Sequence, residues 1–245
     1  MSESKLMLHC GAREVDLDEL AAVPTPEPTA RWFPIGHATV IETVVRSLED
    51  VGLVVERARY GLSRGDARMF ATLDLGVEVV PGVKLAAGVR NSVDQSFPLG
   101  FCAGHRVFIC DNLAFSAELL VRRKHTKFGL DRFKVDITDT VGRLAAFRAA
   151  EVERIVRMRD LDLSDTQAES LMLRAYEHDF ISQRFLPKLI EAWRTPAFEG
   201  ELAGRTAWSL FNCFTLVMAD VSVTNPQRYA AATMKLQSLL SAAAR

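Results

Sequence analysis

The spacing of apolar residues changes twice along the chain, near residues 53 and 112, and these changes constrain the fold more than any other feature. Between residues 53 and 110, β-branched and aromatic residues form four short runs, which are separated by the turn residues Ser63–Asp66, Pro81–Gly82 and Asn91–Gln95. Short connections between strands favour antiparallel pairing. We therefore predict an antiparallel β-meander of about four strands over residues 53–110, with one apolar face.

The segments on either side of this region have helical spacing. Apolar residues from Val40 to Val51 recur every three or four positions and end at Gly52, which predicts one helix before the sheet. After Asn112 we expect helices throughout, beginning with LAFSAELLV and including a long one from Ile137 to about Arg159. One helix, then strands, then helices predicts an α+β fold with a helical C-terminal half.

The domain organisation follows from composition. Residues 1–30 include three prolines in the run Val23–Ala30, which disfavour helix and favour an extended path. The chain has 245 residues and 49% hydrophobic residues, enough to bury a core, and no linker divides the remainder. We expect an extended segment over 1–30 and a single α+β domain over 31–245, whose helical C-terminal extension covers about 137–245.

Several functional classes are disfavoured by the sequence. The four cysteines lack the pair spacing of a zinc site and no targeting segment is visible, so we expect reduced thiols in a cytoplasmic protein. The apolar stretch Leu210–Val223 contains Asn212 and Asp220 and is too short to span a bilayer, so no membrane partner is expected. The chain has no P-loop, H-E-x-x-H or G-x-S-x-G motif, and we predict no cofactor and no resident metal.

Basic residues are concentrated in the stretch RRKHTKFGLDRFK, although the whole chain has a net charge of -1. Clustered Arg and Lys can neutralise phosphates, and interleaved phenylalanines can stack on unpaired bases. A second basic group on the first predicted hairpin could extend such a surface. The predicted nucleic-acid-binding residues are Arg57, Arg59, Arg64, Arg122, Arg123, Lys124, Lys127, Phe128, Arg132, Phe133 and Lys134. The competing interpretation is a solvated charged surface that binds nothing.

Two other functions stay open at this point. Asp94, His105 and Asp111 lie near the third and fourth predicted strands, and a metal-dependent nuclease would need such acids and a histidine to converge on one pocket. No established motif supports catalysis by these residues, so the protein is expected to be non-enzymatic. Alternatively, the basic segment could bind an acidic protein partner as an interaction factor of a mobile element.

The stretch VRNSVDQSFPLGFCAGHRVFICDNLAF, followed by RRKHT, resembles the phage- and plasmid-encoded family catalogued as domain of unknown function 932. The segment Trp32–His37 and the late TAWSLFNCFTLVMAD are also similar to that family, so the likeness covers most of residues 31–222. The chain departs from the family at Gln95, where glycine is frequent, and at Asp111, where members have another polar residue.

The family has no established activity to carry over, but its place among mobile-element genes implies a nucleic-acid role. A helix, an antiparallel sheet and further helices also look like the core of single-strand annealing proteins. We therefore expect a homo-oligomer that binds single-stranded DNA, or RNA, and that could anneal strands.

Overall fold

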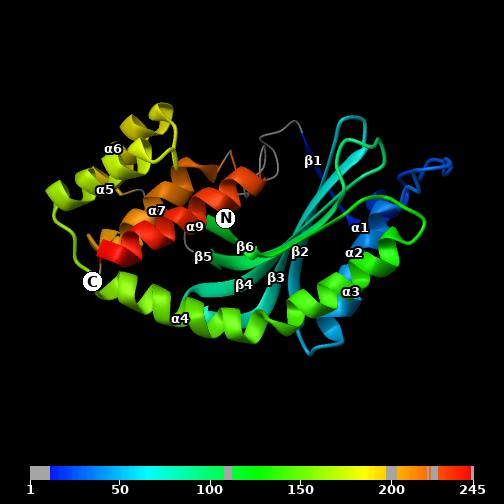
Figure 1. The fold of residues 1–245 in the computed structure, drawn as a ribbon, viewed down its shortest axis with the longest axis horizontal. Helices are drawn as coiled ribbons and strands as arrows, with labels where there is room; N and C mark the ends of the chain where they lie inside the picture. The colour runs from blue at the N-terminus through cyan, green and yellow to red at the C-terminus, as the bar shows by residue number, and fades with distance from the viewer. Residues whose placement is uncertain (1–11, 108–111, 197–202, 220, 222–225, 244–245) are drawn as a thin grey trace.

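An antiparallel sheet of six strands, in the order β1-β2-β3-β4-β5-β6, lies at the centre of the molecule (Figure 1). The computed structural model describes residues 12–107, 112–196, 203–219, 221 and 226–243. Its strands are β1 (Arg13–Val15), β2 (Val55–Ser63), β3 (Arg68–Val80), β4 (Val83–Ser92), β5 (Leu99–Val107) and β6 (Asn112–Arg123). The α+β class and the antiparallel meander are confirmed.

The sheet is larger than predicted, because β1 and β6 lie outside residues 53–110. The run LAFSAELLV, which we predicted as a helix, forms most of β6 and pairs with β5 from Val107↔Asn112 to Leu99↔Arg123. A short apolar run fits a buried strand and a helix segment equally well, so its spacing alone did not distinguish them. The three residues of β1 come from the N-terminal segment that we expected to be extended.

The helices are α1 (Leu17–Ala21), α2 (His37–Glu49), α3 (Gly129–Gly142), α4 (Leu144–Asp160), α5 (Asp165–Glu177), α6 (Leu186–Arg194), α7 (Ala207–Val217) and α9 (Pro226–Ala243), with a 3-10 turn, η1 (Gln183–Phe185), before α6. The single long helix predicted from Ile137 is two helices, α3 and α4, which meet at Arg143. The first of these two helices begins at Gly129, before the predicted start at Ile137. None of the described helices combines the length and the apolarity that a membrane crossing requires.

Helices α2 and α3 cover one face of the sheet near the β2–β3 hairpin, whereas α4 to α9 pack at the other end (Figure 1). The apolar side of α2 supplies buried side chains at helical spacing, among them Val40, Val44 and Leu48. Two polar contacts fix which strand residues point toward these helices. Asn91 of β4 lies 3.0 Å from His37 Nδ1 of α2, and Arg123 of β6 pairs with Asp136 of α3.

The N-terminal segment is held against the tip of the sheet. Asp16 caps α1 by accepting a hydrogen bond from the amide of Glu19. Arg13 binds Glu19 at 2.7 Å and Asp66, in the β2–β3 turn, at 3.1 Å. The chain between α1 and α2 then runs without regular secondary structure through the proline-rich stretch, as its composition predicts.

Candidate nucleic-acid interface

The basic segment does not form one surface, because it runs through three kinds of structure. Arg122 and Arg123 end strand β6, Lys124 to Phe128 form a connection, and α3 begins at Gly129. Successive residues of a strand point to opposite faces, so Arg122 and Arg123 diverge. Arg123 points toward α3, where Nη2 donates to Asp136 Oδ1 at 2.8 Å. Arg122 therefore lies on the face of the sheet that α2 and α3 do not cover.

The two phenylalanines of the segment differ sharply in exposure. Phe133 is fully buried beneath α3, so the structure leaves it no ring face on which a base could stack. Phe128 is 57% exposed, and the ammonium of Lys127 lies 5.7 Å from its ring centroid. Arg132 and Lys134 are exposed on α3, either side of Phe133. Of the two stacking residues predicted from the sequence, only Phe128 is available at the surface.

The second basic group, on the β2–β3 hairpin, is also divided. Arg57 is exposed, but Arg59, on the same face of β2, is only 7% exposed. Arg64 and Arg68 lie 3.4 Å and 3.5 Å from Asp94 Oδ2, and Arg68 donates to Ser96 at 2.9 Å. The Asp94 carboxylate thus engages both of these arginines. Burial acts to raise the pKa of Asp94, but hydrogen bonds from Ser96 and the charges of Arg68 and Arg64 outweigh it and lower that pKa.

A row of paired residues crosses five strands on the face opposite α2 and α3. Its members, from β2 to β6, are Gly61, Phe70, Arg90, Gly100 and Arg122. Because Asn91 points toward α2, the preceding residue Arg90 must point to the other face. We call this set the cross-strand row. Arg57, Arg59 and Arg68 lie on the same face in neighbouring rows, so arginine is the prevailing charged residue there.

The ring of Phe97 contacts two arginines on this face, Arg90 in the row and Arg68 next to it. The guanidinium of Arg90 lies 5.3 Å from the Phe97 ring centroid, and that of Arg68 lies 5.9 Å from it. Such cation–π contacts hold a guanidinium in one orientation while it stays charged. Burial lowers the pKa of Arg90, and the nearby charge of Arg122 lowers it further. Two guanidinium groups on this face therefore belong to residues paired on either side of Gly100.

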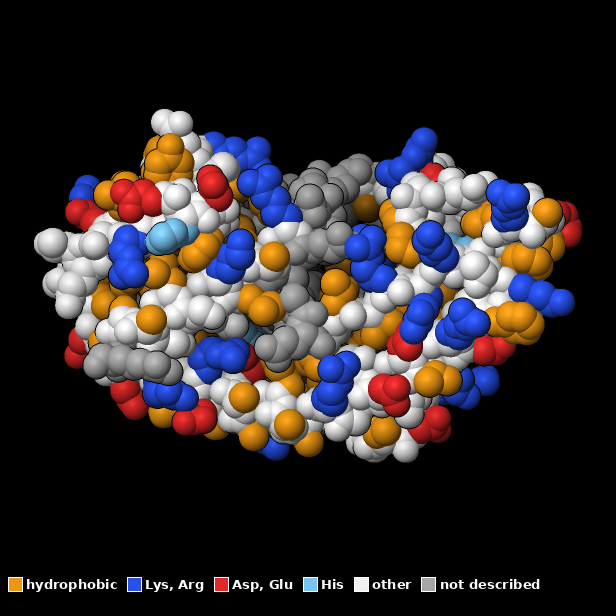
Figure 2. Space-filling view, viewed as in Figure 1, with side chains coloured by type: hydrophobic (Ala, Val, Ile, Leu, Met, Phe, Trp, Pro, Cys, Tyr) orange, Lys and Arg blue, Asp and Glu red, His pale blue; other side chains and the backbone are white. Residues whose placement is uncertain are grey.

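Figure 2 shows Lys and Arg side chains over both halves of the face in view, among them a group at the sheet end of the molecule. Asp and Glu side chains are interspersed among them (Figure 2), in keeping with the ion pairs at Asp94 and Asp136. The cationic surface is therefore patchy rather than a continuous strip.

The sequence prediction did not include Arg90, Phe70 or Phe97 among its candidate residues. A signal was present, because glycines inside strands mark places where another group approaches the backbone closely. Gly100 lies two positions before Cys102, which pairs with Gly88, so glycines recur on the face that carries Arg90. Combining that alternation with the positions of the arginines would have identified the row.

The structure separates the proposed nuclease residues. Asp94 precedes β5 and His105 lies near its far end, six residues beyond Leu99, so roughly 20 Å of strand lies between them. Asp111 lies outside the described residues. Among the residues that the structure describes, no group of three His, Cys, Asp or Glu side chains could hold a metal ion. These observations remove the geometric basis for a metal site built on Asp94 and His105.

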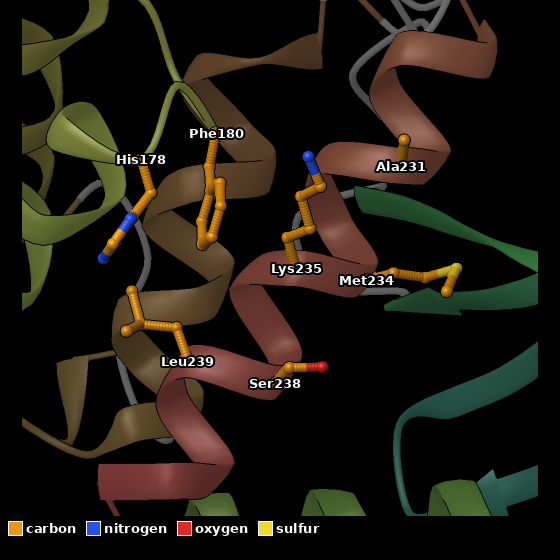
Figure 3. A pocket seen from close by; sticks show the side chains of 7 residues that line it. All are labelled: His178, Phe180, Ala231, Met234, Lys235, Ser238 and Leu239. Atoms are coloured by element: carbon orange, nitrogen blue, oxygen red, sulfur yellow. The ribbon is translucent and has the colours of Figure 1, made fainter.

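A separate cavity of about 490 Å³ lies between the end of α5 and α9, lined mostly by apolar atoms. Figure 3 shows Phe180 and His178 on one side of it, opposite Lys235 and Leu239 of α9. The Lys235 ammonium lies 5.4 Å from the Phe180 ring centroid. This cavity is at the helical end of the molecule, away from the cross-strand row.

No family model, no curated protein and no solved structure matches this chain. Its function must therefore be inferred from its own residues.

Proposed function

We propose that this protein binds single-stranded nucleic acid, DNA in the first instance, on the sheet face that carries the cross-strand row. The observation that carries the proposal is the placement of Arg90 and Arg122 on either side of Gly100, with Phe70 in the same row and Phe97 beside Arg90. Guanidinium groups bind phosphates, and neighbouring aromatic rings accept unpaired bases. The β6–α3 connection, which follows Arg122 in the chain, adds the exposed residues Lys124, Lys127 and Phe128.

The resemblance to the mobile-element family supports the same proposal. Its two motifs, RNSVDQS and RRKHT, begin with Arg90 and Arg122, which are the two arginines of the cross-strand row. A role in annealing requires that several copies of the chain align their binding faces along one strand. We therefore propose a homo-oligomer on nucleic acid, with no chemistry carried out by the chain.

The test is charge reversal on the row. The double variant Arg90→Glu with Arg122→Glu should lose binding to a labelled oligothymidylate in fluorescence anisotropy at low salt. For the wild type, each phosphate contact contributes about 0.7 to the slope of log affinity against log salt concentration. Arg174→Glu with Lys188→Glu is the matched control, because both residues are exposed on α5 and α6 at the other end of the molecule.

Wild-type protein that fails to bind the oligonucleotide at low salt would overturn the proposal, as would equal loss of binding in the control variant. Light scattering with and without the oligonucleotide tests the oligomer. A particle that grows on addition supports an annealing role, and an unchanged monomer bound to the strand contradicts it.

A further inference from the structure

The Arg90 side chain packs closely against the backbone of Gly100. A Cβ atom built on Gly100 would lie 2.8 Å from Arg90 Cγ and 2.9 Å from Arg90 Nε, closer than real Cβ contacts occur. The Arg90 side chain therefore lies directly over the Gly100 backbone, a position that any larger residue at 100 would displace. Phe97 bounds the guanidinium at 5.3 Å. Contacts with Gly100 and Phe97 therefore restrict the position of the Arg90 side chain.

Arg122 lies on the other side of the same glycine. Gly100 pairs with Arg90 on β4 and with Arg122 on β6, so strand β5 lies between the two arginines. Adjacent strands are roughly 4.8 Å apart, which places the two backbones roughly 10 Å apart with a flat glycine between them. Planar guanidinium forks at this spacing can donate to the oxygens of one phosphate from two sides.

Phe70 continues the row on the side of Arg90 away from Gly100. It pairs directly with Arg90 across β3 and β4, and it is partly exposed. Directly paired side chains in a sheet have Cβ atoms about 5 Å apart, so the Phe70 ring is a neighbour of the Arg90 side chain. A nucleotide whose phosphate lies between the arginines would have an aromatic surface within reach of the next base.

We propose that Arg90, held over Gly100, and Arg122 together bind one backbone phosphate with their guanidinium groups, and that Phe70 stacks on an adjacent base, so that the single strand crosses β3 to β6. This inference rests on the proposed function and adds a defined nucleotide subsite to it. It differs from general attraction between basic residues and a polyanion, because it depends on where Arg90 is held and not only on its charge.

Two variants that keep every charge test this placement. Gly100→Ala displaces the Arg90 side chain, and Arg90→Lys replaces the fork by a single ammonium. We expect each to weaken oligothymidylate binding about tenfold or more in anisotropy titrations, which is the size of effect that charged hydrogen bonds produce. Gly142→Ala is the matched control, since a Cβ there meets nothing within 4 Å. Thermal unfolding of each variant checks that the fold is retained.

The stacking part is tested with Phe70→Ala and an abasic strand of the same length. Wild-type protein should prefer the thymidylate over the abasic strand by about tenfold, and Phe70→Ala should reduce that preference. An undiminished preference would overturn the role of Phe70.

The outcomes separate the two proposals. If the wild type binds and Gly100→Ala and Arg90→Lys bind equally well while folded, the shared phosphate site is wrong and nucleic-acid binding stands. If the wild type binds neither strand, the proposed function itself fails. Should Gly100→Ala not fold, Arg90→Lys alone decides, because it leaves the backbone unchanged.

Discussion

His105 Nδ1 lies 3.0 Å from a carboxylate oxygen of Glu151, and both side chains are buried. His105 belongs to β5 and Glu151 to α4, so this contact joins the sheet to the helical half of the protein. Glu151 also accepts a hydrogen bond from Arg154, and the amide of Gln237 on α9 lies 3.5 Å from it. A buried charge is tolerated while its partners are present and becomes costly when one is removed.

We predict that Glu151→Ala lowers the free energy of unfolding by about 3–5 kcal/mol, because it leaves the buried His105 and the partly buried Arg154 without their acceptor. The matched control is Glu153→Ala, which breaks the exposed pair with Arg157 at 2.9 Å two residues along the same helix. Exposed pairs of this kind contribute about 0.5 kcal/mol. Urea unfolding of both variants measures the difference, and equal effects would contradict a structural role for the buried network.

The same network predicts sensitivity to acid. Burial lowers the pKa of His105 from 6.5 to about 4, and the charge of Arg154 adds to this effect. Between these values the unfolded chain binds a proton that the folded protein excludes, so the free energy of unfolding falls as the pH falls from 6.5 toward 4. Above pH 6.5 the residue is neutral in both states and contributes no slope.

We therefore expect His105→Asn to flatten the loss of stability between pH 6.5 and 4, measured as urea midpoints across that range. Asparagine can still donate a hydrogen bond to Glu151 but does not titrate. His178→Asn serves as the control, because His178 is exposed on the surface and its replacement should leave the slope unchanged. A His105→Asn slope identical to that of the wild type would show that another group causes the acid sensitivity.

The sequence was informative about the sheet and the class of fold because both depend on local spacing. It was less informative about the site, because that depends on which strand residues are paired. Arg122 and Arg123 are adjacent and chemically alike, yet one joins the cross-strand row and the other pairs with Asp136. Only the register of β6 against β5 separates them.

The burial of Phe133 was also not predicted, because it depends on where helix α3 begins. Extending α3 back to Gly129 places Phe133, Ile137 and Val141 four residues apart on one buried side. Our prediction began the helix at Ile137, so Phe133 was grouped with the loop and assigned to stacking. The periodicity would have revealed its burial if it had been followed one turn further toward the N-terminus.

The difference in exposure between the buried Phe133 and the exposed Phe128 gives a pair of predictions. Phe133→Ala should destabilise the protein by about 3–5 kcal/mol, because it empties a large volume in a packed core. Phe128→Ala should leave stability almost unchanged, since its ring is 57% exposed, and should weaken oligonucleotide binding if the β6–α3 connection contacts bases. Urea unfolding and anisotropy on the same two variants measure both effects. Equal destabilisation by the two changes would contradict the packing described for α3.

Asp94 offers a test in which binding should improve. Its carboxylate lies within 3.5 Å of Arg64 and Arg68, and Oδ1 accepts a hydrogen bond from the Ser96 amide at 3.0 Å. Asp94→Asn keeps an oxygen that can accept from Ser96 but removes the negative charge beside the arginines. We predict about two- to fivefold tighter binding to single-stranded DNA at low salt, with the gain lost at high salt because the effect is electrostatic.

The Asp94→Asn variant also separates the two functional classes considered for this chain. If Asp94 were a metal ligand of a nuclease, its replacement would abolish metal-dependent cleavage of labelled DNA. If it restrains arginines at the edge of a binding face, the affinity rises and no cleavage is present to lose. Asp66→Asn is a suitable control, because Asp66 lies in the β2–β3 turn and binds a different arginine, Arg13 of β1. Weaker binding by Asp94→Asn, with Asp66→Asn unchanged, would mean that the Asp94 carboxylate itself supports the bound strand.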